Sequence, residues 1–193
     1  MKTYQMKTGA HTLESAPDEA KPLLAAAQKK FGLIPNMYAR MANLPGLLST
    51  YLHGYDLFRA QAGLTPPEQE VVLLVISREN GCEYCVAAHS MVAAMMSQVP
   101  PDVLEAVRNA QPIADPRLQA LAEFTKTMVD KRGNPTPEDA AAFLDAGYTE
   151  QQILGIILAI AVKTLSNYSN HLFHTPVDAA FAKNEWTKPT AAV

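Results

Sequence analysis

The two cysteines of the chain are its most reactive side chains, and they lie three residues apart. Cys82 and Cys85 form a Cys-x-x-Cys pair, and His89 follows the second cysteine by four residues. On a helix, residues separated by three, four and seven positions share a face, so these three side chains would form one stripe. A thiol reacts as its thiolate, and a neighbouring base raises the thiolate fraction. The spacing therefore predicts a dithiol site with a histidine base beside it.

Two helices that meet at a glycine are expected to carry these groups. Thr65 precedes a Pro-Pro pair and lies three residues before Glu68, which is the pattern of a helix N-cap with a capping box. Gly81 interrupts the helical pattern, and a second helix is expected to begin at or near Cys82. Helices joined by so short a connection usually pack antiparallel.

Such a fold-back would bring a carboxylate to the histidine. Glu70 lies eleven residues before Gly81 and His89 eight residues after it, so the two come within about 5 Å of the same level along the helix axes. Ser77 would then face Cys85. The segment VVLLVI that follows Glu70 is apolar on all sides and therefore predicted to be buried. A carboxylate at the head of a buried helix is expected to have a polar partner.

This set of groups is suited to peroxide reduction. A thiolate that attacks a peroxide oxygen becomes a sulfenic acid, and a second thiol within reach condenses with it to form a disulfide. His89 could take the proton of Cys85 while Glu70 orients the imidazole ring. The helix dipole favours Cys82 as the thiolate, because Cys82 lies nearer the helix N-terminus. The residues alone thus leave open which cysteine attacks.

The spacing from Glu70 through Cys82-x-x-Cys85 to His89 resembles the signature of the AhpD-like alkylhydroperoxidases of the carboxymuconolactone decarboxylase superfamily. The resemblance covers about twenty residues; elsewhere the chain matches only as a helical pattern. Tyr84 departs from members that carry a histidine between the cysteines. True lactone decarboxylases of the superfamily lack the cysteine pair, so its presence argues against that reaction.

The resemblance implies an all-helical fold, a homo-oligomer (a trimer or a hexamer), and peroxiredoxin-type reduction of hydroperoxides by the cysteine pair. It assigns the peroxidatic role to Cys85 and the resolving role to Cys82, with Glu70 and His89 as the proton relay. It implies no metal or organic cofactor. The partners are then a small hydroperoxide and an external dithiol that regenerates the pair.

Three alternatives to a peroxidase remain at this point. The first is a dithiol–disulfide oxidoreductase that acts on a protein or on a lipoyl-type carrier. The second is a non-catalytic helical assembly protein, in which the cysteines are small buried residues. The third is a structural zinc site made of Cys82, Cys85, His89 and Glu70, although zinc sites of this pattern usually draw a second ligand pair from elsewhere.

Four further residues are candidates for lining a pocket. Tyr84 lies between the cysteines, and Ser77 lies on the preceding helix, where bonding to its own backbone is the alternative. Asn167 and His171 share a helix face with His174 and could line the substrate cavity or bond across a subunit interface.

Composition limits the class of protein. The chain has 193 residues, of which 48% are hydrophobic, and this suits a single domain over residues 1–193. The net charge of −3, without a basic stripe, gives no support for nucleic-acid binding. No run of 18 apolar residues and no N-terminal apolar h-region appears, so no membrane span or secretory signal is expected. A Cys-x-x-Cys pair suits a reducing compartment, and we expect a cytoplasmic protein.

Helix start and stop signals recur along the whole chain, and no segment alternates with period two, so the fold class is predicted to be all-α. Residues 1–15 are expected to form an extended arm and residues 185–193 a loose tail. The expected helices span about residues 17–31, 34–41, 45–62, 66–80, 82–99, 101–110, 116–131, 136–147 and 150–173.

A weak internal repeat is visible when the cysteine segment is shifted forward by 82 residues. The shift aligns two capped apolar helices, and the second copy lacks the groups for thiol chemistry. It pairs Glu70 with Gln152, Cys82 with Thr164, Cys85 with Asn167 and His89 with His171. A duplicated helical unit with one working site is the interpretation; a chance alignment of two capped helices is the alternative.

Overall fold

The computed structural model describes residues 3–188, and within that range it contains helices and no β-strand. The all-α prediction is confirmed. The elements are α1 (Lys21–Phe31), α2 (Asn36–Met41), α3 (Pro45–Gln61), α4 (Pro66–Glu79), α5 (Glu83–Met95), α6 (Pro101–Asn109), α7 (Pro116–Asp130), α8 (Pro137–Asp145), α9 (Glu150–Phe173) and the 3-10 helix η1 (Ala179–Asn184).

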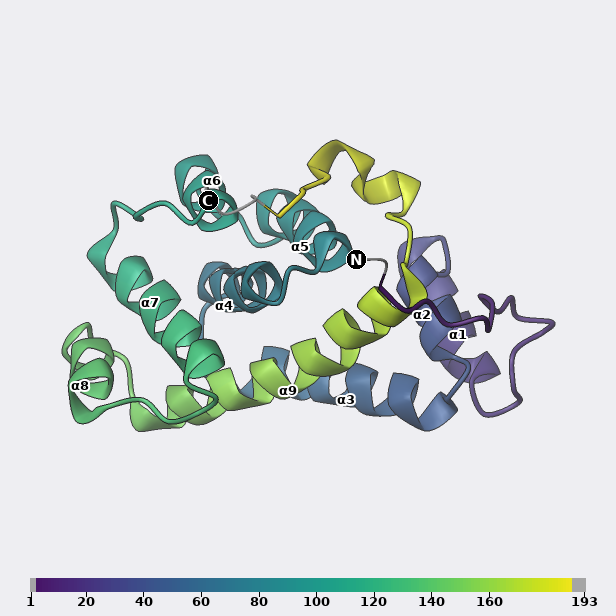
Figure 1. Cartoon of the computed structure of the whole chain (residues 1–193), viewed down its shortest axis with the longest axis horizontal. Coiled ribbons are helices and arrows are strands. Elements are labelled where there is room, and N and C mark those ends of the chain that lie inside the picture. The colour runs from purple at the N-terminus through teal and green to yellow at the C-terminus, as the bar shows by residue number, and fades with distance from the viewer. Residues whose placement is uncertain (1–2, 189–193) are drawn as a thin grey trace.

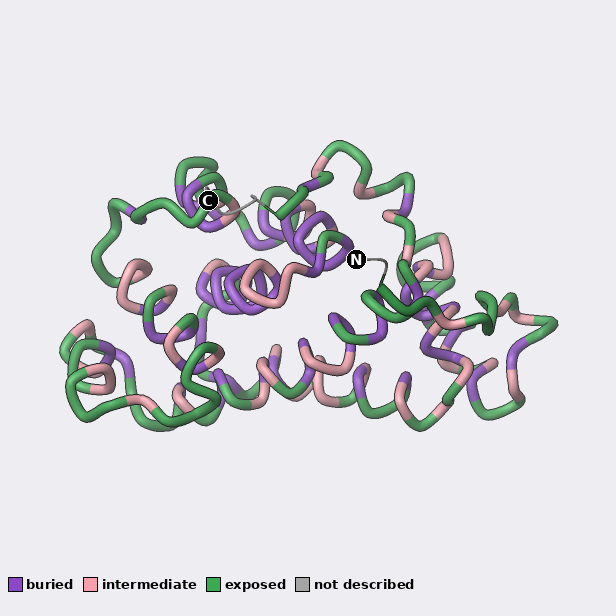
Figure 2. Tube along the Cα trace, in the orientation of Figure 1, coloured by how far each residue is buried: buried purple, intermediate pink, exposed green. Residues whose placement is uncertain are grey.

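The helices surround a central antiparallel pair formed by α4 and α5 (Figure 1). The long helix α9 runs beside α3 along one side of the molecule, and it contacts both α4 and α5. Helices α7 and α8 lie at one end, α1 and α2 at the other, and η1 lies over α5. The residues of α4 and α5 are mostly buried (Figure 2), so the segment that carries the cysteines forms the core.

The turn between α4 and α5 has the predicted form. The capping box of Thr65 and Glu68 begins α4. Gly81 has a φ of 70°, a left-handed conformation that glycine adopts without a steric penalty. The backbone N–H of Cys82 then donates to the carbonyl oxygen of Ser77 at 2.9 Å, which closes the turn. The chain reverses here, and α5 returns along α4.

The first helix begins later than predicted. Residues 17–20 form turns, and α1 begins at Lys21 and ends before Gly32. Pro22 has no N–H to donate to the carbonyl of residue 18, so the helical hydrogen-bond series cannot extend back to residue 17. The hydroxyl of Ser15 accepts a bond from the N–H of Thr12 at 3.0 Å within the preceding turn, so it does not cap this helix.

Helix α9 is unbroken over 24 residues from its capping box of Thr149 and Gln152. In the repeat alignment Lys163 stands where Gly81 reverses the first copy, so the second copy is one continuous helix instead of a hairpin. By length and composition α9 could cross a membrane, but half of the qualifying window is buried within the molecule. A core helix meets the same criteria, and α9 packs against α3 and α4.

Both ends of the described range are held against the rest of the fold. The described part of the predicted arm is non-helical from residue 3 to residue 12, and it lies on its own chain: the N–H of Met6 donates to the carbonyl of Leu172 at 2.8 Å. The prediction of a loose tail is wrong for residues 185–188. Trp186 is buried, and its indole N–H donates to the carbonyl of Arg108 at 3.0 Å, which anchors the segment after η1. The rest of the predicted tail, residues 189–193, lies outside the described residues.

Candidate active site

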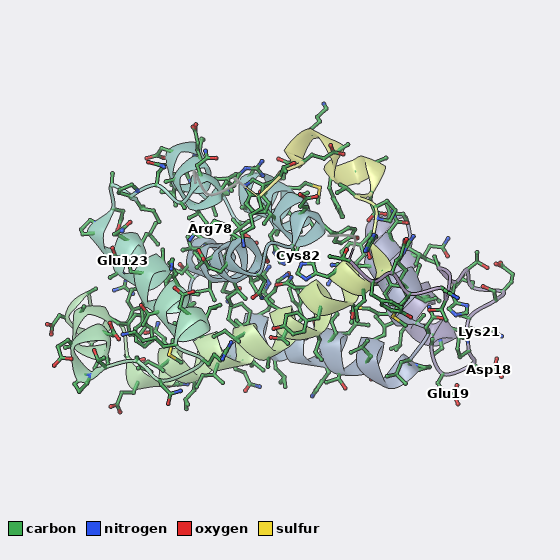
Figure 3. The ribbon with its side chains drawn as sticks, in the orientation of Figure 1. Asp18, Glu19, Lys21, Arg78, Cys82 and Glu123 are labelled. Carbon is green, nitrogen blue, oxygen red and sulfur yellow. The ribbon has the colours of Figure 1, made fainter. Side chains whose placement is uncertain are left out.

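The cysteine pair lies in the interior of the molecule, where α5 begins beside α9 (Figure 3). Cys82 is the N-cap of α5 and Cys85 lies in its first turn. Both are free thiols, with 1% and 2% of their surface exposed. The side-chain amide of Asn170 contacts both sulfur atoms: Nδ2 lies 3.6 Å from Cys82 Sγ and 3.3 Å from Cys85 Sγ. One donor from α9 therefore bridges the two thiols.

Glu70 and His89 meet as the reversal at Gly81 predicts. The Nδ1 atom of His89 lies 2.9 Å from Glu70 Oε2, and Glu70 is fully buried. The other carboxylate oxygen of Glu70 accepts from the guanidinium of Arg59 on α3, which also donates to the hydroxyl of Tyr55. Burial raises the pKa of Glu70, but the charges and hydrogen bonds of His89 and Arg59 outweigh it and hold that pKa below its usual value.

His89 is held as a neutral base. Burial lowers its pKa, the charge of Lys163 lowers it further, and Glu70 opposes both effects without cancelling them. A neutral imidazole carries one N–H, and the bond to Glu70 places that proton on Nδ1. The Nε2 atom is then left as a proton acceptor on the side away from Glu70.

Helix α9 supplies a buried lysine to the same site. Lys163 has no exposed surface, and its amino group has no hydrogen-bond partner among residues 3–188. It lines the same cavity as Cys85 and His89. Lys163, Ser166 and Asn170 are separated by three and four positions, so they share a helix face. Ser166 Oγ lies 3.9 Å from Cys85 Sγ, so this face of α9 is turned toward Cys85.

The two thiols differ in acidity. Burial raises the pKa of Cys85, but the hydrogen bond from Cys82 and the charge of Lys163 outweigh it, so that pKa lies well below its usual value. The hydrogen bond to Cys85, together with burial, raises the pKa of Cys82 well above its usual value. The helix dipole alone would give Cys82 the lower pKa, and here its effect is outweighed. Cys82 is the N-cap of α5. Cys85 lies 3.3 Å from the amide nitrogen of Asn170 and lines the same cavity as Lys163.

An apolar cavity of about 300 Å³ opens beside Cys85; we call it the apolar cavity. Aromatic rings form much of its wall, and His89 and Lys163 are its basic groups. It is lined by Phe31, Leu33, Pro35, Met37, Tyr38, Tyr51, Tyr55, Tyr84, Cys85, Ala88, His89, Met91, Val92, Met96, Lys163, Ala180 and Phe181. A small organic molecule fits a cavity of this size and lining.

A second cavity of about 500 Å³ lies beside Cys82; we call it the polar cleft. It is lined by Thr3, Gly81, Cys82, Glu83, Tyr84, Asn170, His171, His174 and Thr175. Among the described residues, Tyr84 alone lines both cavities. Its hydroxyl donates to Asp178 Oδ2 at 2.6 Å and accepts from the N–H of Met37 at 3.4 Å, so its ring is fixed between them.

The other predicted pocket residues have different surroundings. Ser77 Oγ donates to the carbonyl of Leu73 on its own helix at 2.6 Å and lines neither cavity. Asn167 is buried and accepts from the amide of Asn80 at 2.9 Å, away from the sulfurs. His171 is exposed on the wall of the polar cleft instead of the apolar cavity. The expectation that Asn167 faces the substrate is thus wrong, because the helix turns Asn170 toward the cysteines.

Sequence reasoning missed Lys163, Asn170 and Arg59. The sequence carries a signal for Lys163, since a lone lysine in the apolar run IILAIAVKTL must either leave the core or have a function in it. Asn170 and Arg59 carry no such signal. Within residues 3–188, no group of three or more His, Cys, Asp and Glu side chains is placed to hold a metal ion.

Comparison with known proteins finds a family match for the segment that carries this site. Residues 47–127 match the model of the carboxymuconolactone decarboxylase family. No curated protein matches the sequence.

Solved structures share the fold over nearly the whole chain. One is the AhpD core, an uncharacterized peroxidase-related protein from Ralstonia eutropha JMP134: TM-score 0.80, 23% identity, covering 91% of this chain and 93% of that one. Another peroxidase-related protein, from Silicibacter sp. TM1040, has a TM-score of 0.73 at 21% identity, covering 93% and 96%. The debrominase Bmp8 has a TM-score of 0.75 at 16% identity, covering 93% and 96%. The family segment contains Glu70, the cysteine pair and His89, and the whole chain shares the fold of these AhpD-like and debrominase structures.

Proposed function

We propose that the protein is a thiol-dependent hydroperoxide reductase in which Cys85 attacks the peroxide. One observation carries the proposal: an acidic thiol lies at the wall of an apolar cavity, and the same cavity is lined by a neutral histidine and by a lysine whose amino group has no hydrogen-bond partner among residues 3–188. A thiolate in such a place is a strong nucleophile that is reachable by small organic molecules.

The reaction proceeds in two steps on the cysteine pair. The Cys85 thiolate attacks the terminal oxygen of the hydroperoxide, the O–O bond breaks, and Cys85 becomes a sulfenic acid. The departing alkoxide takes a proton and leaves as the alcohol; Lys163 stabilises the developing negative charge. Cys82, assisted by His89 as proton acceptor, then attacks the sulfenic sulfur, and a Cys82–Cys85 disulfide and water result. Glu70 and Arg59 act as positioning residues, because they hold His89 in its neutral Nδ1–H form.

Peroxide consumption by the pre-reduced protein tests the proposal. We expect the wild type to consume one equivalent of cumene hydroperoxide and to form one intramolecular disulfide. Cys85→Ser should consume none, and Cys82→Ser should stop at the sulfenic acid, which dimedone labels. Wild-type protein that leaves cumene hydroperoxide untouched while both thiols titrate normally would refute the function.

Reductive dehalogenation of an aromatic halide is a second candidate. The cavity is lined by Tyr38, Tyr51, Tyr55 and Tyr84, which suit a planar ring. A similar structure is that of the debrominase Bmp8, as a cysteine-to-alanine variant in complex with 2,3,4-tribromopyrrole (TM-score 0.74, 15% identity). In this reaction the thiolate takes the halogen, the ring carbon takes a proton, and the second thiol displaces halide to give the disulfide. Bromide release from tribromopyrrole without peroxide would identify this activity.

The remaining parts of the proposal concern partners. We propose that the cysteine pair needs no metal or organic cofactor, that a dithiol regenerates it in a reducing cytoplasm, and that the chain forms a homo-oligomer. Support for association comes from α9, which exposes 65% of Leu154, 47% of Ile157, 57% of Tyr168 and 43% of Leu172. Sedimentation equilibrium measures the oligomer number; a monomer at micromolar concentration would contradict this part.

A further inference from the structure

The two cysteines face separate cavities, and this separation suggests separate entrances for the two substrates. Cys85 lines the apolar cavity and Cys82 lines the polar cleft, and the fixed ring of Tyr84 lies at the boundary of both. We propose that the polar cleft binds the reductant, a small polar dithiol, which attacks Cys82 and never enters the apolar cavity. The proposal rests on the proposed function in that both use the Cys82–Cys85 disulfide.

The acidity of the two thiols agrees with attack at Cys82. Thiol–disulfide exchange is faster when the departing sulfur is the more acidic one. Attack at Cys82 expels Cys85, whose thiolate is surrounded by the Asn170 amide, Ser166 and the lysine of α9. Attack at Cys85 would expel Cys82 instead, whose pKa is raised by the hydrogen bond to Cys85 and by burial, so it is the poorer leaving group. The site therefore favours attack of the reductant on Cys82, the cysteine that lines the polar cleft.

Two residues of the cleft wall, Asn170 and Thr175, each carry a buried acceptor atom that has no partner among residues 3–188. Asn170 is 5% exposed, and its Oδ1 has no hydrogen-bond partner among the described residues, although its Nδ2 contacts both sulfurs. Thr175 Oγ1 is also buried without a partner in that part of the chain. Buried polar atoms without a partner carry a free-energy cost, so their presence at a cavity wall points to a group that satisfies them.

The size and depth of the cleft favour a small reductant over a folded protein. A volume of about 500 Å³ falls within the range of small-molecule sites. The Cys82 residue is 1% exposed, so an attacking sulfur must reach into the cleft on a thin, flexible molecule. The cleft wall carries the hydroxyl of Thr3, the imidazole of His171 and the carboxylate of Glu83, and these polar groups favour a hydrophilic reductant.

The proposed exchange balances. One thiolate of the dithiol attacks Cys82 Sγ, the S–S bond breaks, and Cys85 leaves with the electron pair as a thiolate. The second thiol of the reductant, after losing its proton, attacks the reductant sulfur of the mixed disulfide. Cys82 departs and takes up a proton, and the reductant leaves as a cyclic disulfide. Two electrons have passed from the dithiol to the cysteine pair.

Blocking each cavity separately tests the proposal. His171→Trp fills the polar cleft, and Ile157→Trp is its control on an exposed position of the same helix outside both cavities. Met96→Trp narrows the apolar cavity; Met95→Trp, 76% exposed and outside it, is the matched control. Oxidation by cumene hydroperoxide and re-reduction by dithiothreitol are followed in separate single-turnover experiments.

We expect a crossed pattern. His171→Trp should slow re-reduction about tenfold and change oxidation less than about twofold, and Met96→Trp should do the reverse, because each blocks one approach to the sulfurs. The control variants should change neither rate. Re-reduction that is slowed no more by His171→Trp than by Ile157→Trp, or slowed equally by Met96→Trp, would overturn the proposal. Faster re-reduction by reduced thioredoxin than by an equal concentration of dithiothreitol would overturn the choice of a small reductant.

The sulfur that is attacked can be identified directly. Cys85→Ser and Cys82→Ser each leave one thiol, which is converted to a mixed disulfide with thionitrobenzoate. Adding His171→Trp should slow the release of thionitrobenzoate by dithiothreitol from Cys82 and not from Cys85. The disulfide of the wild type is prepared with diamide, so re-reduction can be measured even if no hydroperoxide reacts. Failure of the proposed function and failure of this inference are thereby distinguishable.

Discussion

The α4–α5 hairpin and helix α9 form two halves of the proposed active site, and they differ in how their residues come together. The hairpin supplies Glu70, Cys82, Cys85 and His89 from twenty consecutive residues, and a single reversal at Gly81 aligns them. Helix α9 supplies Lys163 and Asn170 from about eighty residues further along the chain. The hairpin half holds the reacting groups, and the α9 half sets the electrostatic field in which they react. The predictions below test that division.

Removing the charge of Glu70 should have the largest effect, because it damages the hairpin half in two ways. Glu70→Gln leaves the partly buried Arg59 without a counter-ion and releases His89 from its tautomer. Breaking a fully buried pair costs about 3–5 kcal/mol of unfolding free energy, and the partial exposure of Arg59 should keep the loss at or below the lower end of that range. Peroxide turnover should fall by about a hundredfold or more, as for loss of a general base. Urea unfolding and single-turnover kinetics measure the two effects.

Glu68→Gln is the matched control on the same helix. Glu68 is also buried and paired, with Arg117 and Tyr148, but it lies at the far end of α4 from the cysteines. We expect lower stability with an unchanged turnover rate. Equal loss of turnover in both variants would show that Glu70 acts through stability alone.

Lys163→Met tests the α9 half and should have the next largest effect. Without the lysine the pKa of Cys85 rises, because the charge that favours its thiolate is gone. The alkylation rate of Cys85 at pH 7 should fall by about tenfold to a hundredfold, and its pH profile should move to higher pH. The unfolding free energy should not fall, since the lysine amino group has no hydrogen-bond partner among residues 3–188. An unchanged pH profile would contradict the role of α9.

Asn170→Leu removes the amide that contacts both sulfurs and should have a smaller effect. A hydrogen bond to a charged group contributes about 1.5–3 kcal/mol, so the thiolate of Cys85 should become less favourable by about tenfold in its ionisation constant. Asn167→Leu is the control, because Asn167 bonds to Asn80 and not to sulfur. The absorbance of the thiolate near 240 nm, followed against pH, measures the change. If Asn170→Leu and Asn167→Leu shift the titration of Cys85 equally, the role assigned to the α9 half is wrong.

Raising the pH should have the smallest effect, and it is measured on the alkylation rate of Cys85 in the wild-type protein. The pKa of Cys85 lies well below its usual value, so the thiolate is already formed at neutral pH. Raising the pH from about 7 to about 9 should change its alkylation rate less than about twofold, whereas an ordinary cysteine would gain more than about tenfold. The rate should fall only on acidification through the lowered pKa. A steep rise above neutral pH would show that Cys85 is not activated.

The hairpin half was predictable from the sequence because its geometry is local. The spacing of Cys82, Cys85 and His89 fixes a common helix face, and the glycine at position 81 specifies where the chain reverses. The capping boxes of α4, α8 and α9 likewise fix helix starts through contacts three residues apart. These features need only neighbouring residues to form.

The α9 half was not predictable because it depends on which face of a long helix the core selects. Asn167 and Asn170 are both asparagines on the same helix, so the sequence does not distinguish their roles. The packing of α9 against α5 turns Asn170 toward the sulfurs. The anchoring of Trp186 fails to show in the sequence for the same reason, since its partner carbonyl belongs to Arg108 in a distant helix. The late start of α1 could have been predicted from the sequence, because Pro22 lacks the N–H that an earlier helix start requires.

The short helix η1 has a consequence for how activity can diverge. Its residues Ala180 and Phe181 form part of the wall of the apolar cavity, but it holds none of the groups that react. Part of the cavity wall is therefore encoded far along the chain from the proposed reacting groups. An exchange of residues 177–184 for the corresponding segment of a protein with the same fold should alter which molecule the cavity admits and leave the cysteine pair in place. The segment near the C-terminus is thus the place to redirect this scaffold toward a new organic substrate.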